Sequence, residues 1–339
     1  MSRSRSREMD LTTGSPFWSL LKFAIPVILG NLFQLFYTLA DSVIVGKTLG
    51  AESLAAVGST SIIIYFVFCF INGFTGGFGI CLGQRCGAKD EQGMRKSIAV
   101  STLLSIAFTV VLTLVCCLLS RQILVWMQIP DDIAEEANAY MFVVLLGTGA
   151  TVFYNMISNM LRALGDSKTP LYFLILSSFL NIVLDLFLIV VVKLGTAGAA
   201  YATIIAQGVS ALLCFIYMFR KFDILKTSRE DYYLDGYGVF NMLSIGIPMA
   251  LNYSITAIGT MILQGAVNIF GSSVVAAFTA ASKVENLSTQ TMPTLGTAIA
   301  TYCGQNLGAG KYKRIYEGMR KGFFICIFIS LAASADVLL

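Results

Sequence analysis

Long apolar runs separated by short polar stretches recur along the whole chain. Nine runs are about 20 residues or longer, which is the length that an α-helix needs to cross a lipid bilayer. The predicted spans cover residues 18–42, 54–82, 97–119, 135–160, 170–192, 196–219, 240–264, 274–303 and 320–339. Residues 1–17 are basic and polar and lack the apolar core of a signal peptide, so they are predicted to form a solvated tail. The pattern therefore predicts an all-α, polytopic membrane protein.

Positive charge divides unevenly between the predicted loops. If the spans alternate across the membrane, 19 of the 23 Lys and Arg residues lie on the side of the N-terminus and three on the other, with Lys283 inside a span. Since Lys and Arg accumulate on the cytoplasmic side, we expect a cytoplasmic N-terminus and a multi-pass protein of the cell (plasma or inner) membrane. The net charge of +4 follows from this bias and gives no reason to expect nucleic acid as a partner.

An internal duplication divides the chain into two similar units. Three patterns recur in the same order, at a shift of 221 to 225 residues. They are Ile25-Pro26, which returns as Ile247-Pro248, the pattern GQxxGA at residues 83–88 and 304–309, and GMRK at 93–96 and 318–321. A recurrence of this kind indicates two similar structural repeats in the chain.

The repeat sets the expected domain boundaries. We predict a cytoplasmic tail at residues 1–17, an N-terminal lobe of six helices at 18–219, a cytoplasmic linker at 220–239 and a partial C-terminal lobe at 240–339. Because six spans separate the units, both begin on the same side and form parallel repeats. Residue 339 corresponds to about residue 114 of the first unit, so we expect the second lobe to lack three helices in this sequence.

Composition excludes most enzyme classes. Only 12% of the residues are charged and 56% are hydrophobic, whereas soluble domains carry about 25% charged residues. The chain contains no histidine, which excludes HExxH zinc sites and histidine-based triads. The eight cysteines show no CxxC spacing and are expected to be buried apolar residues. With no GxGD or GxSxG motif either, we expect neither an enzymatic activity nor a cofactor.

Two acids lie inside the predicted spans of the first unit. Asp41 and Asp185 both fall in the outer half of the bilayer, with Tyr37 and Asn181 one helical turn before them and Thr203 at a similar depth. Ionisable residues inside a membrane are costly and indicate function. The carboxylates with Asn181 would suit Na⁺, whose preferred ligands are oxygens, or the pair could share a proton. In the alternatives, Asp41 is solvated at the outer surface and Asp185 makes a structural hydrogen bond.

The chain resembles the multidrug and toxic compound extrusion (MATE) family. The resemblance rests on the two units, the repeated GQxxGA, the loop RALGDSKTP at residues 162–170 and the acids Asp41 and Asp185. It implies a twelve-helix secondary transporter that exports organic cations and other amphipathic compounds in exchange for Na⁺ or H⁺. It also implies that the two acids and their polar neighbours form the cation site of the N-terminal lobe. The chain departs from the family pattern in lacking the last three helices.

Polar residues in other spans are secondary candidates. Tyr140 is expected to join the acid network, and Asn155 either joins it or makes interhelical hydrogen bonds. In the second unit, Asn252 and Gln264 are candidates for a substrate cavity. Glu285 either attracts a cationic substrate there or lies at the membrane edge.

Pro26 is a candidate hinge inside the first span. Proline removes a backbone hydrogen bond and can bend a helix. A bend that responds to the ligand of Asp41 would couple ion binding to cavity shape, and a static kink is the alternative. The glycines of GQxxGA are expected to end their helices.

The function predicted from these features is an ion-coupled exporter that works by alternating access, in the lipid bilayer and as a monomer when full length. One alternative is a flippase for a lipid-linked sugar, which would need several basic residues in its cavity, whereas Lys283 is the only base inside a predicted span. Another is a non-transporting remnant, because the second unit is incomplete.

Overall fold

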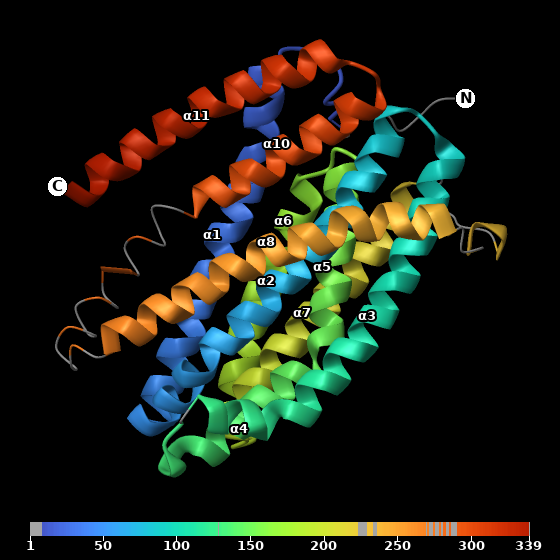
Figure 1. The fold of residues 1–339 in the computed structure, drawn as a ribbon. Coiled ribbons are helices and arrows are strands. Elements are labelled where there is room, and N and C mark those ends of the chain that lie inside the picture. The colour runs from blue at the N-terminus through green and yellow to red at the C-terminus, as the bar shows by residue number, and fades with distance from the viewer. Residues whose placement is uncertain are drawn as a thin grey trace.

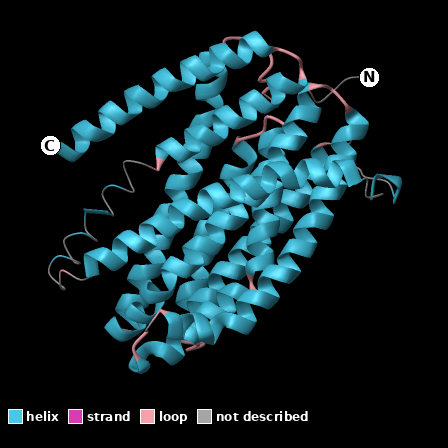
Figure 2. Ribbon diagram, in the orientation of Figure 1, coloured by secondary structure: helices cyan, strands magenta, loops and turns pink. Residues whose placement is uncertain are grey.

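The computed structural model describes residues 9–127, 129–222, 229–232, 236–268 and 290–338, and a few isolated residues between 270 and 285. All regular elements in these ranges are helices, and no strand occurs among them (Figure 2). The prediction of an all-α protein is confirmed.

Six long helical segments form the first unit, and they alternate in direction (Figure 1). They are α1 (Pro16–Thr48), α2 (Ala51–Gly87), α3 (Glu91–Trp126), α4 (Asp131–Leu146) with α5 (Thr148–Ala163), α6 (Lys168–Asp185) with a π-helix (Leu186–Val191), and α7 (Thr196–Lys221). Each predicted span coincides with one segment to within a residue or lies inside it. The helices extend further than predicted because they continue beyond the apolar runs into polar residues. At the start of α3 the side chain of Asp90 caps the helix by accepting a hydrogen bond from the N–H of Gly93 at 2.9 Å.

The fourth predicted span, 135–160, is a bent pair of helices. The axes of α4 and α5 meet at 43°, with Gly147 at the break. A side chain at Gly147 would collide with the side chain of Ile204 on α7. The close approach of Ile204 explains why glycine occupies the break.

Three helices form the described part of the second unit, after a short 3-10 helix at Arg229–Tyr232. They are α8 (Gly236–Asn268), α10 (Thr291–Gly308) and α11 (Tyr312–Leu338). The predicted span 274–303 lies partly outside the described residues, and α10 contains its end. Helices α8 and α10 pack on α2, and α10 and α11 pack on α1, so α1 and α2 carry most of the helix contacts between the units (Figure 1).

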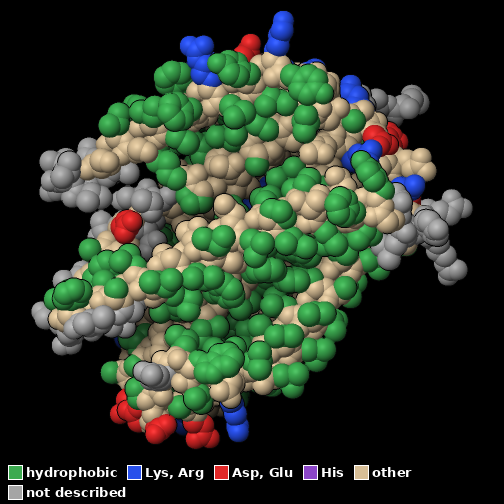
Figure 3. All heavy atoms as spheres, in the orientation of Figure 1, with side chains coloured by type: hydrophobic (Ala, Val, Ile, Leu, Met, Phe, Trp, Pro, Cys, Tyr) green, Lys and Arg blue, Asp and Glu red, His purple; other side chains and the backbone are tan. Residues whose placement is uncertain are grey.

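The outer surface suits a lipid environment. Six described helices are long and apolar enough to cross a membrane, or seven spans if α4 and α5 count as one; α10 and α11 are not among them. Apolar side chains cover the flank of the molecule, and charged side chains gather near its two ends (Figure 3). Bulky apolar residues such as Leu118 and Phe179 are exposed. The protein is a multi-pass membrane protein.

Candidate functional site

The carboxyl groups of Asp41 and Asp185 meet inside the first unit. Asp41 lies on α1, which continues to Thr48, so Asp41 is not at a solvated helix end. Asp185 is the last residue of α6 and is 0% exposed. Asp41 interacts directly with Asp185 and with the side chain of Thr203 on α7. Three helices therefore bring together the two acids and the hydroxyl that the sequence singled out.

Several oxygen atoms in this cluster have no hydrogen-bond donor. Both carboxylate oxygens of Asp185, Oδ1 of Asp41 and Oδ1 of Asn181 are buried without a partner among the described residues. The amide Nδ2 of Asn181 donates to Oγ1 of Thr203 at 3.3 Å, which turns its oxygen away from that hydroxyl. No Lys or Arg forms an ion pair with either acid in the described part of the chain. The arrangement has an excess of acceptors and is suited to a bound cation.

The backbone changes its helical form directly after Asp185. Residues Leu186–Val191 form a π-helix, and the N–H of Val192 donates to the carbonyl of Phe187 five residues earlier, at 3.0 Å. Short π-segments insert one residue into a helix and occur frequently at functional sites. The run LFLIVV carries no signal for this change and predicts an ordinary continuation of the span.

A second polar group lies deeper in the same unit, around a small cavity of about 30 Å³. Tyr37 is buried there and interacts with Gln34 and Gln207. Thr151 donates to Oε1 of Gln207 at 2.6 Å, and Nδ2 of Asn155 donates to the carbonyl of Thr151 at 2.8 Å. A cavity of this size and polarity can hold about one water molecule. Asn155 thus joins Tyr37, and Gln34 and Gln207 are members that the sequence analysis missed.

Tyr140 connects the two polar groups. Its phenol, in the second half of α4, lies close enough to Asp41, Asp185 and Tyr37 to interact electrostatically with all three. The predicted cation-site residues and the secondary candidate Tyr140 therefore lie in one region of the first unit.

The candidates in the second unit are placed less completely. Asn252 is exposed on α8, and Gln264 lies in the same helix with its side chain outside the described residues. Glu285 is exposed, and Lys283 lies outside the described residues. Their contribution to a substrate cavity stays a prediction. Pro26 is buried inside α1, and its role as a hinge also stays a prediction.

The sequence analysis also missed Arg162. The segment RALGDSKTP predicts a loop that begins at Arg162, whereas the structure places this residue in the last turn of α5. Its Nε is buried without a hydrogen-bond partner among the described residues, near Tyr154 and Cys214 and within electrostatic reach of Tyr253 on α8. A buried basic side chain therefore lies in α5, next to residues of α7 and α8.

Residues 9–15 form an N-terminal strap that binds the second unit. Leu11 is 0% exposed; its N–H donates to Oε1 of Gln305 at 3.1 Å, and its carbonyl accepts from Nδ2 of Asn306 at 3.1 Å. Arg314 donates to the carbonyls of Gly14 at 2.8 Å and Thr13 at 3.0 Å. The expectation of a solvated tail is wrong for this segment, because its main chain supplies partners for side chains of α10 and α11.

The strap also contacts the first unit. The N–H of Met9 donates to the carbonyl of Gly165 at 3.3 Å. Gly165 has a φ of 86°, and a side chain there would collide with the main chain of Met9. Nε2 of Gln305 donates to the carbonyl of Ala163 at 2.7 Å. The side-chain amide of Gln305 therefore binds the strap through its oxygen and the first unit through its nitrogen.

The two GQxxGA segments face each other at this end of the molecule. They end α2 at Gly87 and α10 at Gly308, as predicted. A side chain at Gly87 would collide with the main chain of Gln305, and one at Gly308 with the main chain of Gln84. The glycine of each copy thus leaves room for the main chain of the other copy. The two contacts are equivalent, so the interface has an approximate two-fold symmetry.

Comparisons with known proteins agree with this architecture. The MatE family model matches residues 26–187 and 248–339, two segments that start 222 residues apart, as the sequence repeat does. The chain is 33% identical over 311 residues to the probable multidrug resistance protein YpnP of Bacillus subtilis, and the match covers 90% of this chain and 68% of that protein.

Solved structures are similar over almost the whole chain. A MOP superfamily transporter from Pyrococcus furiosus superposes with a TM-score of 0.91 at 27% identity, covering 99% of this chain and 74% of that one. A multidrug resistance MATE family transporter of the MOP superfamily, solved in an outward-facing conformation, also gives a TM-score of 0.91 at 27% identity and covers 99% and 75% of the two chains.

Proposed function

Because this chain belongs to the MATE family of membrane transporters, we propose that it exports organic cations or other amphipathic compounds in exchange for Na⁺ or H⁺. The observation that carries the proposal is the contact between Asp41 and Asp185: Oδ1 of Asp41 and both carboxylate oxygens of Asp185 are buried without a hydrogen-bond partner among the described residues. Substrate class is supported by the name of a relative, the probable multidrug resistance protein YpnP.

The acid pair needs a cation for physical reasons. A buried carboxylate without a partner loses its hydration and has no hydrogen bond or ion pair to replace it, which costs several kcal/mol. Two adjacent carboxylates repel each other as well. Na⁺ would satisfy Asp41, Asp185 and Oδ1 of Asn181 together, since hard cations prefer oxygen ligands, and a proton shared by the two acids would remove one of the charges. The charge of the pair would therefore change when either cation binds or leaves.

Alternating access requires that the contacts between the units separate in turn. The strap and the GQxxGA contact hold one end of the two units together. Lys and Arg side chains gather at the end where the strap lies (Figure 3), and the positive-inside rule assigns such an end to the cytoplasm. The proposal is therefore a cell-membrane carrier with a cytoplasmic N-terminus, acting as a monomer, whose cytoplasmic end is closed in this structure.

Efflux of a fluorescent lipophilic cation from cells tests the proposal. Asp41→Asn and Asp185→Asn should each abolish ion-driven efflux while membrane insertion persists, because each removes a charge from the pair. The matched control is Asp131→Asn, an exposed acid at the start of α4, which should retain efflux.

Full efflux in both site variants would overturn the ion-coupling role. No efflux from the unchanged chain at normal abundance would favour a non-transporting remnant. Transport of a lipid-linked sugar that depends on Arg162 would favour the flippase, for which that buried base is the supporting observation.

A further inference from the structure

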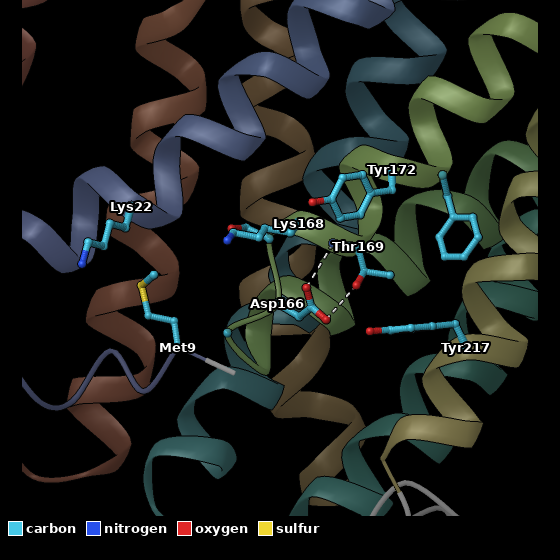
Figure 4. Close-up of a pocket in the computed structure, with 10 residues that line it drawn as sticks. Met9, Lys22, Asp166, Lys168, Thr169, Tyr172 and Tyr217 are labelled. Carbon is cyan, nitrogen blue, oxygen red and sulfur yellow. Dashed lines mark hydrogen bonds between the residues drawn. The ribbon is translucent and has the colours of Figure 1, made fainter. Parts of the chain in front are cut away.

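A hollow of about 650 Å³ lies at the end of the first unit that carries the strap (Figure 4). Met9 of the strap, Lys22 of α1, Lys168 and Tyr172 of α6 and Tyr217 of α7 line it. Lys22 comes from α1 and Lys168 from the first turn of α6, and both line the hollow (Figure 4). The volume is within the range of sites that bind small molecules or headgroups.

The hollow carries net positive charge. Lys22 and Lys168 are both exposed, and neither takes part in an ion pair among the described residues. The one acid in the lining, Asp166, is already satisfied. It accepts from Nζ of Lys221 at 2.7 Å and from the N–H and hydroxyl of Thr169 at 3.0 and 2.8 Å. An anion entering the hollow would therefore meet two available ammonium groups and a neutralised carboxylate.

An apolar wall continues from the hollow along the two helices that carry the lysines. On α1, Ile25 and Leu29 follow Lys22 at helical spacing and are exposed. On α6, Tyr172 (64% exposed), Ile175 and Phe179 follow Lys168 in the same way. The residues of each helix recur every three or four positions, so each set lies on the same face as its lysine.

The two helices are close enough for these faces to form one surface. Gly30 of α1 has no side chain, and the position of a Cβ there lies 3.5 Å from the side chain of Leu174 on α6. A cationic hollow at a helix end with an exposed apolar wall below it has the two halves that a phospholipid requires: a phosphate site and a surface for acyl chains. Basic sites between transmembrane helices near the membrane surface bind anionic lipid headgroups in this way.

We propose that this hollow is a binding site for an anionic phospholipid, with the phosphate between Lys22 and Lys168 and the acyl chains along the wall formed by α1 and α6. Tyr172, at the junction of the two parts, packs beside the glycerol region, where amphipathic aromatic rings are favoured. The headgroup also lies against Met9, whose N–H is bonded to Gly165. The lipid thus contacts the strap and favours the arrangement in which the cytoplasmic end is closed.

The test measures the unfolding temperature of the purified chain in detergent while phosphatidylglycerol is titrated in. We expect a saturable rise in that temperature with phosphatidylglycerol and none with phosphatidylcholine, which has no net charge. Lys22→Gln combined with Lys168→Gln should weaken the apparent affinity about 30-fold, the loss expected for two lysines at an anionic lipid surface. Lys22→Arg combined with Lys168→Arg should keep most of the affinity for phosphatidylglycerol. That result would show that the glutamine pair binds weakly because its charge is removed and not because its fold is disturbed.

Two controls separate this site from general electrostatic attraction. Lys96→Gln combined with Lys321→Gln removes two exposed charges outside the hollow, and the affinity should stay unchanged. Glycerol 3-phosphate, a headgroup without acyl chains, should give no comparable stabilisation. Equal losses in the two glutamine pairs, or equal protection by phosphatidylcholine, would overturn the site, and equal protection by glycerol 3-phosphate would overturn its assignment to a lipid.

Discussion

Gly87 of α2 lies directly against the main chain of Gln305 of α10, so that even a methyl group does not fit between them. The two residues belong to different copies of the same motif and lie at the end of the molecule where the strap crosses. The relationship makes the glycine a determinant of how closely the units approach, in addition to its role in ending a helix.

Gly87→Ala should therefore destabilise the packed arrangement of the two units. Forcing a methyl group into a filled contact costs about 1–3 kcal/mol, and the effect is measured as a lower unfolding temperature in detergent. Gly58→Ala is the matched control, because Gly58 also lies in α2 and has no atom within 4 Å of its Cβ position. Alanine in an open helical position is neutral or stabilises by up to about 1 kcal/mol. Equal behaviour of the two variants would contradict the tight contact.

Arg314→Ala should release the strap. The side chain of Arg314 binds the carbonyls of Gly14 and Thr13 and the amide oxygen of Asn306. Each hydrogen bond to a charged group contributes about 1.5–3 kcal/mol, so hydrogen exchange of the amides in residues 9–15 should accelerate about tenfold or more. Arg320→Ala, which removes an exposed arginine from the same helix, should leave exchange in the strap unchanged; an equal acceleration would mean that Arg314 does not hold it.

Gly147 and Ile204 should behave as a coupled pair. Gly147→Ala places a methyl group on the side chain of Ile204 and should cost about 1–3 kcal/mol of stability. Ile204→Ala removes every atom involved in that collision, so the double variant should be more stable than the sum of the single losses predicts, by about 1 kcal/mol or more. Strict additivity in thermal unfolding would show that Ile204 is not what requires glycine at the break.

The sequence predicts much of the first unit because its signals are local. Asp41 and Asp185 stand out since acids are rare in apolar runs, and helical spacing places Tyr37 and Asn181 on the faces of these acids. The repeat of GQxxGA likewise predicts where α2 and α10 end. These features depend on spacing within one helix, which a sequence records directly.

The features that were missed depend on distant residues. Leu11 and Gln305 are 294 positions apart, and neither residue type signals that a polar tail docks on α10. The break at Gly147 depends on Ile204 of another helix, and nothing in LFLIVV indicates the π-helix after Asp185. Arg162 follows an apolar run, which predicts a loop there, whereas α5 continues through it to Ala163.

The central claim is that Asp41 and Asp185 together hold the ion that drives export. The most direct test follows substrate and ions at once in proteoliposomes, with ²²Na⁺ and an internal pH indicator reporting counter-movement. We predict that the unchanged chain moves Na⁺ or H⁺ opposite to the substrate, that Asp185→Asn loses both movements, and that Asp131→Asn keeps both. Substrate movement by Asp185→Asn with the same ion dependence as the unchanged chain would contradict the account.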